Sequence, residues 1–293
     1  MLLANKLPIR YFFLATRKDI FYVTAVTVLL FLLHLQFDFI KIPLLVSTIL
    51  GTTIALILSF RLSQSYDRWW EARQIWGAIV NDSRTLTLQL LHFTSPEERK
   101  QAEDTAKMQI AWTDTLARML RGRQPDKKLL EKYLAEDDMT SVIDAPHPVL
   151  AITDLLYRNV KSIGSLTIYE AMQINTTQAR LVDALGQAER IKKTVFPIEY
   201  PFYLHITIYL FVAFMSISLA NLGHHWEILL IIFISAPFFM LEKAAEHLQD
   251  PFENRPTDIP VSAISRTVER DTLALIGEKE LPPPYPEKGF YIN

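Results

Sequence analysis

The sequence has 293 residues, of which 50% are hydrophobic and 21% are charged, and its formal net charge is −2. A charge so close to zero gives no attraction to phosphates, so nucleic acid is excluded as a partner. The absence of cysteine excludes disulfides, thiol catalysis and Cys-ligated zinc. A content of eight glycines argues against a sheet protein with many turns. The composition therefore predicts an all-α chain that is partly membrane-spanning and partly soluble.

Four apolar segments are predicted to cross a membrane as helices. They cover about 20–37, 42–60, 201–222 and 226–241. A helix needs about 20 mostly apolar residues to cross about 30 Å of hydrocarbon, and the second segment contains no ionisable residue. The fourth segment is short and contains Pro237, so a buried helix of a soluble domain is the alternative interpretation for it.

Basic residues near the predicted spans indicate their orientation. One side of the membrane would hold Arg10, Arg17, Lys18, Arg61, Arg68, Arg73, Lys243, Arg255 and Arg266. The opposite connectors, 38–41 and 223–227, hold only Lys41 as a fixed positive charge. The positive-inside rule then places both termini and residues 61–200 in the cytoplasm. We expect no cleavable signal peptide, because the first apolar run begins near residue 20 and is too long.

Small and hydroxylated residues gather in the first half of the second predicted span. They are Ser47, Thr48, Gly51, Thr52 and Thr53. Such residues indicate either close helix packing or a water-lined surface. Thr52, Leu56 and Phe60 are each four residues apart, so they drift by about 40° per step and share one helix face. This face is either a packing stripe or part of a pore, and Leu58, off the face, is expected to face lipid.

Residues 61–200 are predicted to form a helical cytosolic region. Ser95-Pro96-Glu97-Glu98 indicates a helix start, with proline in the first turn and acids near the positive end of the dipole. Apolar residues at helical spacing predict helices over about 97–121, 148–174 and 176–195. The tail, 250–293, is rich in proline and is predicted to be an extended arm.

Catalytic and metal-binding motifs are absent from the sequence, so no enzyme activity, cofactor or metal is predicted. The histidines are 34, 92, 147, 205, 224, 225 and 247. His224-His225 is interpreted as two loop residues at a headgroup boundary rather than as a metal site. Glu242, Glu246 and His247 follow the fourth span and form either a small polar cluster or a solvated helix end.

An aromatic and basic run, Arg68-Trp69-Trp70-Glu71, follows the second span. Arg and Trp are favoured at the headgroup boundary, so the run is predicted to lie there. We expect Arg68 to be held by Asp67 or Glu71, and the run to fix the angle at which the helix leaves the membrane.

The run Ser65–Glu71, followed by Trp76-Gly77, resembles the bestrophin family, its bacterial branch in particular. Gln249–Phe252 is similar to the family's Asn-Pro-Phe element. The resemblance extends over nearly the whole chain, as one unit covering 1–293. It implies a homopentamer around a single axial pore in a bacterial inner (plasma) membrane. It also implies passive conduction of inorganic ions, with anions such as chloride as the family's usual ions.

The resemblance further implies two constrictions in the pore. The family's neck residues lie sixteen, twelve and eight positions before the Arg of Arg-Trp-Trp. Counted back from Arg68, these positions are Thr52, Leu56 and Phe60. Thr52 departs from the usual large apolar residue, which implies a wider and wetter outer ring. The cytosolic constriction is expected near Met172, Gln173 and Ile174, with Ile174 preferred.

Two other functions stay open, and a third is disfavoured. One is a cation-selective channel of the same fold, because apolar rings do not choose the sign of an ion. Another is a non-conducting membrane scaffold. A secondary transporter would show repeated halves and broken helices with charges at midplane, which the sequence lacks. Animal bestrophins bind calcium after Asn-Pro-Phe, but here the segment Glu253–Asp258 is interrupted by Arg255, so no calcium site is expected.

Overall fold

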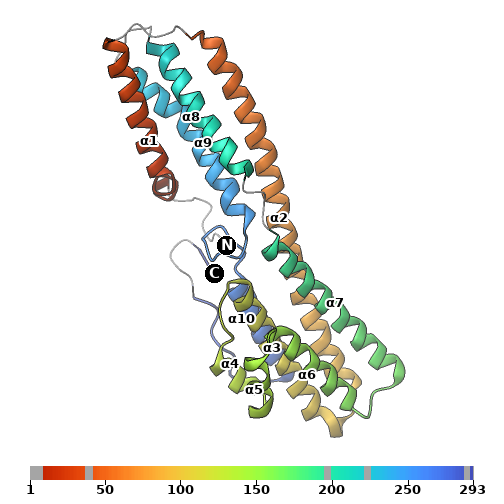
Figure 1. Cartoon of the computed structure of the whole chain (residues 1–293). Helices are drawn as coiled ribbons and strands as arrows, with labels where there is room; N and C mark the ends of the chain where they lie inside the picture. The colour runs from red at the N-terminus through yellow and green to blue at the C-terminus, as the bar shows by residue number, and fades with distance from the viewer. Residues whose placement is uncertain (1–8, 37–41, 195–198, 221–225, 287–290, 293) are drawn as a thin grey trace. The chain divides into compact units, whose positions relative to one another are not determined.

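The computed structural model describes residues 9–36, 42–194, 199–220, 226–286 and 291–292. Helices are the only regular elements in these ranges, which confirms the predicted all-α class for them. In chain order they are α1 (Ile9–Gln36), α2 (Leu44–Phe93), the 3₁₀ helix η1 (Pro96–Glu98), α3 (Arg99–Leu120), α4 (Lys127–Tyr133), α5 (Glu136–Asp144), α6 (Pro148–Ser162), α7 (Ile168–Lys193), α8 (Glu199–Ala220), α9 (Glu227–Gln249) and α10 (Val261–Ile276) (Figure 1).

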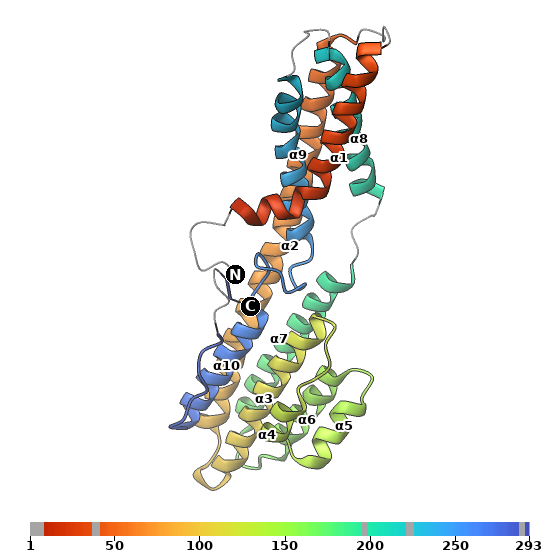
Figure 2. The same ribbon diagram turned by 90° about the vertical axis from the view of Figure 1, so that its left-hand side faces the viewer.

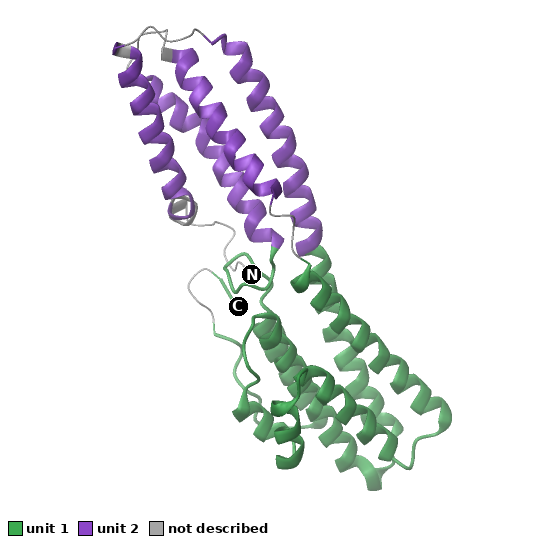
Figure 3. Cartoon of the chain, viewed as in Figure 1, with its two compact units in different colours: residues 1–3, 70–194, 250–293 green, residues 4–69, 195–249 purple. Residues whose placement is uncertain are grey.

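The described chain divides into two compact units (Figure 3). The apolar unit comprises the described residues of 4–69 and 195–249, and the polar unit comprises those of 70–194 and 250–293. Helix α2 is 50 residues long, and the division between the units falls within it, after Trp69.

In the apolar unit, α1, α8 and α9 contact one another, and the first part of α2 packs against their shared core (Figures 1 and 2). The core contains a cluster of buried apolar side chains, among them Val23, Ile54, Leu58, Ile208, Phe211, Ile231 and Phe239. Many other large apolar side chains point away from this core, including Phe233, which is 80% exposed, and Leu229, which is 71% exposed. This distribution is typical of helices whose outer surface faces lipid.

Three described helices are long and apolar enough to cross a membrane, namely α2, α8 over Glu199–Leu219, and α9. They contain most of the described parts of the second, third and fourth predicted spans. The first predicted span, 20–37, falls in α1, which is not one of these three and whose described part ends at Gln36. The connectors with Lys41 and His224-His225 lie outside the described residues.

The polar unit is built around α3, which contacts α6, α7 and α10. Its core includes the fully buried Trp76, Trp112 and Leu116. Helix α3, preceded by η1, matches the helix predicted over 97–121, and Ser95 stands at the N-cap of η1 without a capping hydrogen bond from its side chain.

The boundary between the next two helices differs from the prediction. The sequence predicts helices over 148–174 and 176–195, whereas α6 ends at Ser162 and α7 begins at Ile168. A capping box between Thr167 and Glu170 starts α7, and the Glu98 carboxylate accepts hydrogen bonds from the backbone N of Gly164 and Ser165, both at 2.9 Å. These polar contacts hold the linker in a non-helical conformation.

The predicted extended arm also needs correction. Within 250–293, residues 261–276 form helix α10, and Val261, Val268 and Leu273 on it are buried. The helix ends at Gly277, whose φ of 96° is in the left-handed region that favours glycine. Apolar residues at helical spacing lie between the prolines of this tail, and they pack against α3.

Candidate pore-lining site

Helix α2 presents two different faces in the apolar unit. Ile54 is 0% exposed and Leu58 is 2% exposed, so both point into the core of the unit. Leu56 is 57% exposed and Phe60 is 60% exposed, and Thr52 is also exposed. The stripe of Thr52, Leu56 and Phe60 is therefore not a packing surface inside the subunit. The prediction that Leu58 faces lipid is wrong. Its side chain lies about 200° around the helix from that of Leu56, and that direction points into the core of the unit.

The small residues of α2 separate onto the same two faces. Ser47 is buried with its Oγ 3.3 Å from the Oγ of Ser218 on α8, and a Cβ on Gly51 would stand 3.1 Å from the ring of Phe211. These two residues let α2 and α8 approach closely. Thr48 and Thr52 are exposed, and the hydroxyl of Thr52 donates to the carbonyl of Thr48 at 2.9 Å. Close helix packing therefore explains Ser47 and Gly51, whereas a water-lined surface stays a prediction for Thr48 and Thr52.

A group of ionisable side chains, of which Asp19, Arg61 and Glu242 are buried and His205 is half-buried, links all four helices of the apolar unit. Arg61 of α2 is 2% exposed, and its Nη1 lies 3.6 Å from Oε1 of Glu242 on α9. The second oxygen of Glu242 lies 2.9 Å from Nδ1 of His205 on α8. His205 Nε2 in turn lies 3.6 Å from Oδ1 of Asp19 on α1. Because Arg61 follows Phe60 directly, this group fixes the rotation of α2 and so keeps the stripe on the outer face.

Sequence reasoning missed this charged group. It treated Arg61 as a boundary cation and Glu242 as part of a cluster with Glu246 and His247. Glu246 instead accepts from Lys243 at 2.6 Å. The four members come from four helices far apart in the chain, so no spacing rule connects them. An available signal was the presence of Asp19 and His205 in or beside apolar segments, since ionisable groups there need partners.

The aromatic and basic run on α2 is partly explained by its contacts. The rings of Tyr66 and Trp69 stack with centroids 6.1 Å apart, and Trp70 is 47% exposed. Glu71, one of the two carboxylates expected to hold Arg68, forms an ion pair with Arg190 of α7. The pairing of Arg68 with Asp67 or Glu71 stays a prediction.

The residues expected at the cytosolic constriction differ in exposure. Ile174 is 0% exposed, so its side chain packs inside the polar unit, whereas Met172 is 64% exposed and Gln173 is also exposed. The start of α7 carries two more outward apolar side chains, Ile168 at 77% and Tyr169 at 76% exposure. Burial therefore argues against Ile174, the preferred residue.

The segment after α9 is held by a lysine. Lys192 Nζ donates to Oδ2 of Asp250 and to Oε1 of Glu253, each at 2.8 Å. Asp258 is 1% exposed, and its Oδ2 accepts from the backbone N of Arg255 at 2.8 Å. Burial raises the pKa of Asp258 to about 6. Among the described residues, no group of three or more His, Asp and Glu side chains is arranged to hold a metal ion.

A family model described as Bacterial/Fungal Bestrophin protein matches residues 14–274. The chain belongs to the bestrophin family. The relatives of this bestrophin include the voltage-dependent anion channel-forming protein YneE of Salmonella typhi, 32% identical over 87% of this chain and 84% of the relative. YneE of Escherichia coli K12 is 31% identical over 90% of this chain and 86% of the relative.

Solved structures support the same assignment. The crystal structure of a bacterial bestrophin homologue from Klebsiella pneumoniae is similar with a TM-score of 0.83 and 27% identity, covering 89% of this chain and 98% of that chain. Membership of the bestrophin family confirms the resemblance seen in the Arg-Trp-Trp run and points away from enzymatic activity.

The raised pKa of Asp258 predicts a pH-dependent stability of this bestrophin. The folded state binds the proton more strongly than the unfolded state, so stability rises as pH falls through 6 and is lost as pH rises. The difference from the ordinary pKa corresponds to at most about 3 kcal/mol. Melting temperatures at pH 7.5 and pH 5 check this. The Tm of the wild type minus that of Asp258→Asn should increase at the lower pH, and the same comparison with the exposed Asp144→Asn should not. A difference that does not depend on pH would contradict the prediction.

Proposed function

We propose that this bestrophin is a passive anion channel that conducts chloride through a neck of apolar side chains. The observation that carries the proposal is the outward stripe of Leu56 and Phe60 on a helix long enough to span a membrane. In the proposed channel these side chains form closed rings, because neighbouring subunits present the same stripe to a shared axis. The relatives named as voltage-dependent anion channel-forming proteins support the choice of ion.

The neck would act by dewetting. Rings of Leu56 and Phe60, one residue from each subunit, would form a short hydrophobic constriction in which ions lose hydration without meeting a binding site. The ring of Thr52 would be wider, because threonine is smaller than leucine or phenylalanine, and wetter, because its hydroxyl oxygen can still accept a hydrogen bond from water while its O–H donates to the carbonyl of Thr48. The second constriction, at the start of α7, is proposed to involve Met172 together with Ile168, which lies one turn earlier on the same face.

The proposed setting is a bacterial inner membrane with four spans per subunit and both termini in the cytoplasm. Support for α1 as a span, in addition to α2, α8 and α9, comes from its contacts with α8 and α9 in the apolar unit. The basic residues that flank the apolar stretches, namely Arg17 and Lys18 in α1, Arg68 and Arg73 in α2 and Lys243 in α9, support the orientation.

A homopentamer is the expected oligomer, because the four helices of one subunit cannot enclose a pore, whereas a cyclic arrangement of identical interfaces can. Native mass measurement on protein purified in mild detergent should give five copies of the chain. A monomer or dimer in several mild detergents would contradict the channel proposal.

Two alternatives from the sequence make different predictions. A non-conducting scaffold would release no chloride from protein-loaded liposomes, whereas the channel should release it faster than empty liposomes. A cation channel of the same fold would conduct but with the opposite selectivity. The apolar neck itself favours neither sign, so the support for anions comes from the relatives.

A further inference from the structure

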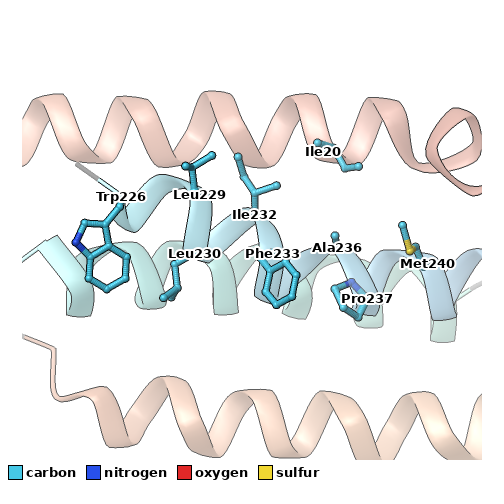
Figure 4. A pocket seen from close by; sticks show the side chains of 9 residues that line it. All are labelled: Ile20, Trp226, Leu229, Leu230, Ile232, Phe233, Ala236, Pro237 and Met240. Carbon is cyan, nitrogen blue, oxygen red and sulfur yellow. The ribbon is translucent and has the colours of Figure 1, made fainter. Parts of the chain in front are cut away.

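An elongated apolar groove of about 860 Å³ runs along the outer side of α9 (Figure 4). Ile20 of α1 lies near one end, and Trp226, just before α9, lies at the other. Along its length the groove is lined by apolar residues of α9, from Leu229 through Phe233 to Met240. No residue of α2 lines it, so the groove is separate from the proposed pore stripe.

The length of the groove fits a lipid tail. Fourteen residues separate Trp226 from Met240, which is about 21 Å along a helix. This is more than half of the roughly 30 Å hydrocarbon thickness of a bilayer. Phe233 is 80% exposed and lines the groove, and the smaller side chains of Ala236 and Pro237 beside it leave space for a ligand (Figure 4). One extended acyl chain can therefore lie along α9.

Charge distinguishes the two ends of the groove. Arg17 and Lys18 are exposed and come three and two residues before Ile20. Lys243, three residues beyond Met240, already pairs with Glu246 at 2.6 Å. The stretch from Trp226 to Met240 contains no lysine or arginine. Positive charge is thus concentrated at the Ile20 end, where it matches the phosphate of a lipid whose tail enters the groove.

We propose that the groove binds one acyl chain of an anionic phospholipid whose headgroup contacts Arg17 and Lys18. The basic pair selects anionic over zwitterionic headgroups, because each lysine or arginine near a membrane surface attracts anionic lipid. The apolar groove holds the acyl chain of an anionic or a zwitterionic phospholipid equally well. Lipid binding at this groove requires a membrane location but not ion conduction, so the lipid measurement and the conduction measurement test separate properties.

The test is native mass spectrometry of the full-length protein with added phosphatidylglycerol or phosphatidylcholine of the same acyl chains. Wild-type protein should retain phosphatidylglycerol at least about tenfold more strongly. The double variant Arg17→Gln, Lys18→Gln should lose that preference but still bind both lipids. The charge-matched control Lys127→Gln, Lys161→Gln, which removes exposed lysines of the polar unit, should retain the preference.

Two further variants test the groove. Ala236→Trp should fill the groove and weaken the binding of both lipids equally. Phe233→Ala removes an exposed side chain and so leaves the core of the unit intact. It should weaken the binding of both lipids several-fold, and it replaces Ala236→Trp in the test if that variant fails to fold. Equal retention of the two lipids by wild-type protein would overturn the proposal. So would loss of the oligomer in Ala236→Trp without loss of lipid per subunit, because a neighbouring subunit would then occupy the groove.

Discussion

Replacing Phe60 with alanine is expected to raise ion flux per assembled channel. Phe60 is 60% exposed in the subunit, so its truncation leaves little cavity in the core. In the proposed pentamer the same change removes five phenyl groups, one from each subunit, from the pore axis. The constriction should widen and hydrate, which lowers its barrier to ions. Single-channel conductance in a planar bilayer measures this directly, and Leu56→Ala should act in the same direction.

The matched control is Phe202→Ala. Phe202 of α8 is 59% exposed, so the chemical change and the exposure are nearly those of Phe60, but the residue lies on another helix. Its variant should conduct like the wild type. Leu58→Ala is unsuitable as a control, because Leu58 is buried and its truncation is expected to destabilise the unit by about 2–5 kcal/mol. Equal conductance of the Phe60→Ala and Phe202→Ala variants would place the stripe away from the pore.

Replacing Glu242 with alanine is expected to cause the largest loss of stability. The variant leaves the charge of Arg61 buried without its carboxylate, which costs about 3–5 kcal/mol in buried pairs. The 3.6 Å separation of Arg61 and Glu242 is long for a hydrogen bond, so the pair depends on charge rather than on close geometry. Thermal unfolding of the purified protein should show a large decrease in Tm, with loss of the oligomer.

Two comparisons separate charge burial from a general effect of mutation at the end of α9. Glu246→Ala removes a carboxylate that is 45% exposed and pairs with Lys243, so it should cost less than about 1 kcal/mol. The double variant Arg61→Met, Glu242→Leu removes both charges and should recover much of the lost stability. If Glu242→Ala and Glu246→Ala were equally mild, the charged group would not hold α2 in its rotation.

Helical periodicity placed Thr52, Leu56 and Phe60 on one face of α2 but did not decide whether that face points outward or what lies opposite it. The shared face follows from spacing alone, because a helix returns to one face every three to four residues. The error at Leu58 came from treating lipid as the only alternative to a pore. A helix at the edge of a four-helix unit also has a face toward its own core, and Ile54 and Leu58 occupy it.

Other differences have similar physical causes. The break before α7 was readable in Thr167 and Glu170, whose spacing is that of a capping box, but apolar residues on both sides made the helix seem continuous. Prolines around α10 hid its apolar spacing. The group of Asp19, Arg61, His205 and Glu242 exists only because four helices pack together, so the sequence showed each charge without its partner.

The selectivity of the current tests the proposed anion channel most directly. Purified protein would be reconstituted in a planar bilayer with a tenfold gradient of potassium chloride, and the reversal potential would be measured. An anion channel is expected to reverse near the chloride equilibrium potential, about 59 mV from zero for a tenfold gradient of a monovalent ion. Reversal near the potassium equilibrium potential, which has the opposite sign, would contradict the anion assignment, and the absence of any current would contradict the channel itself.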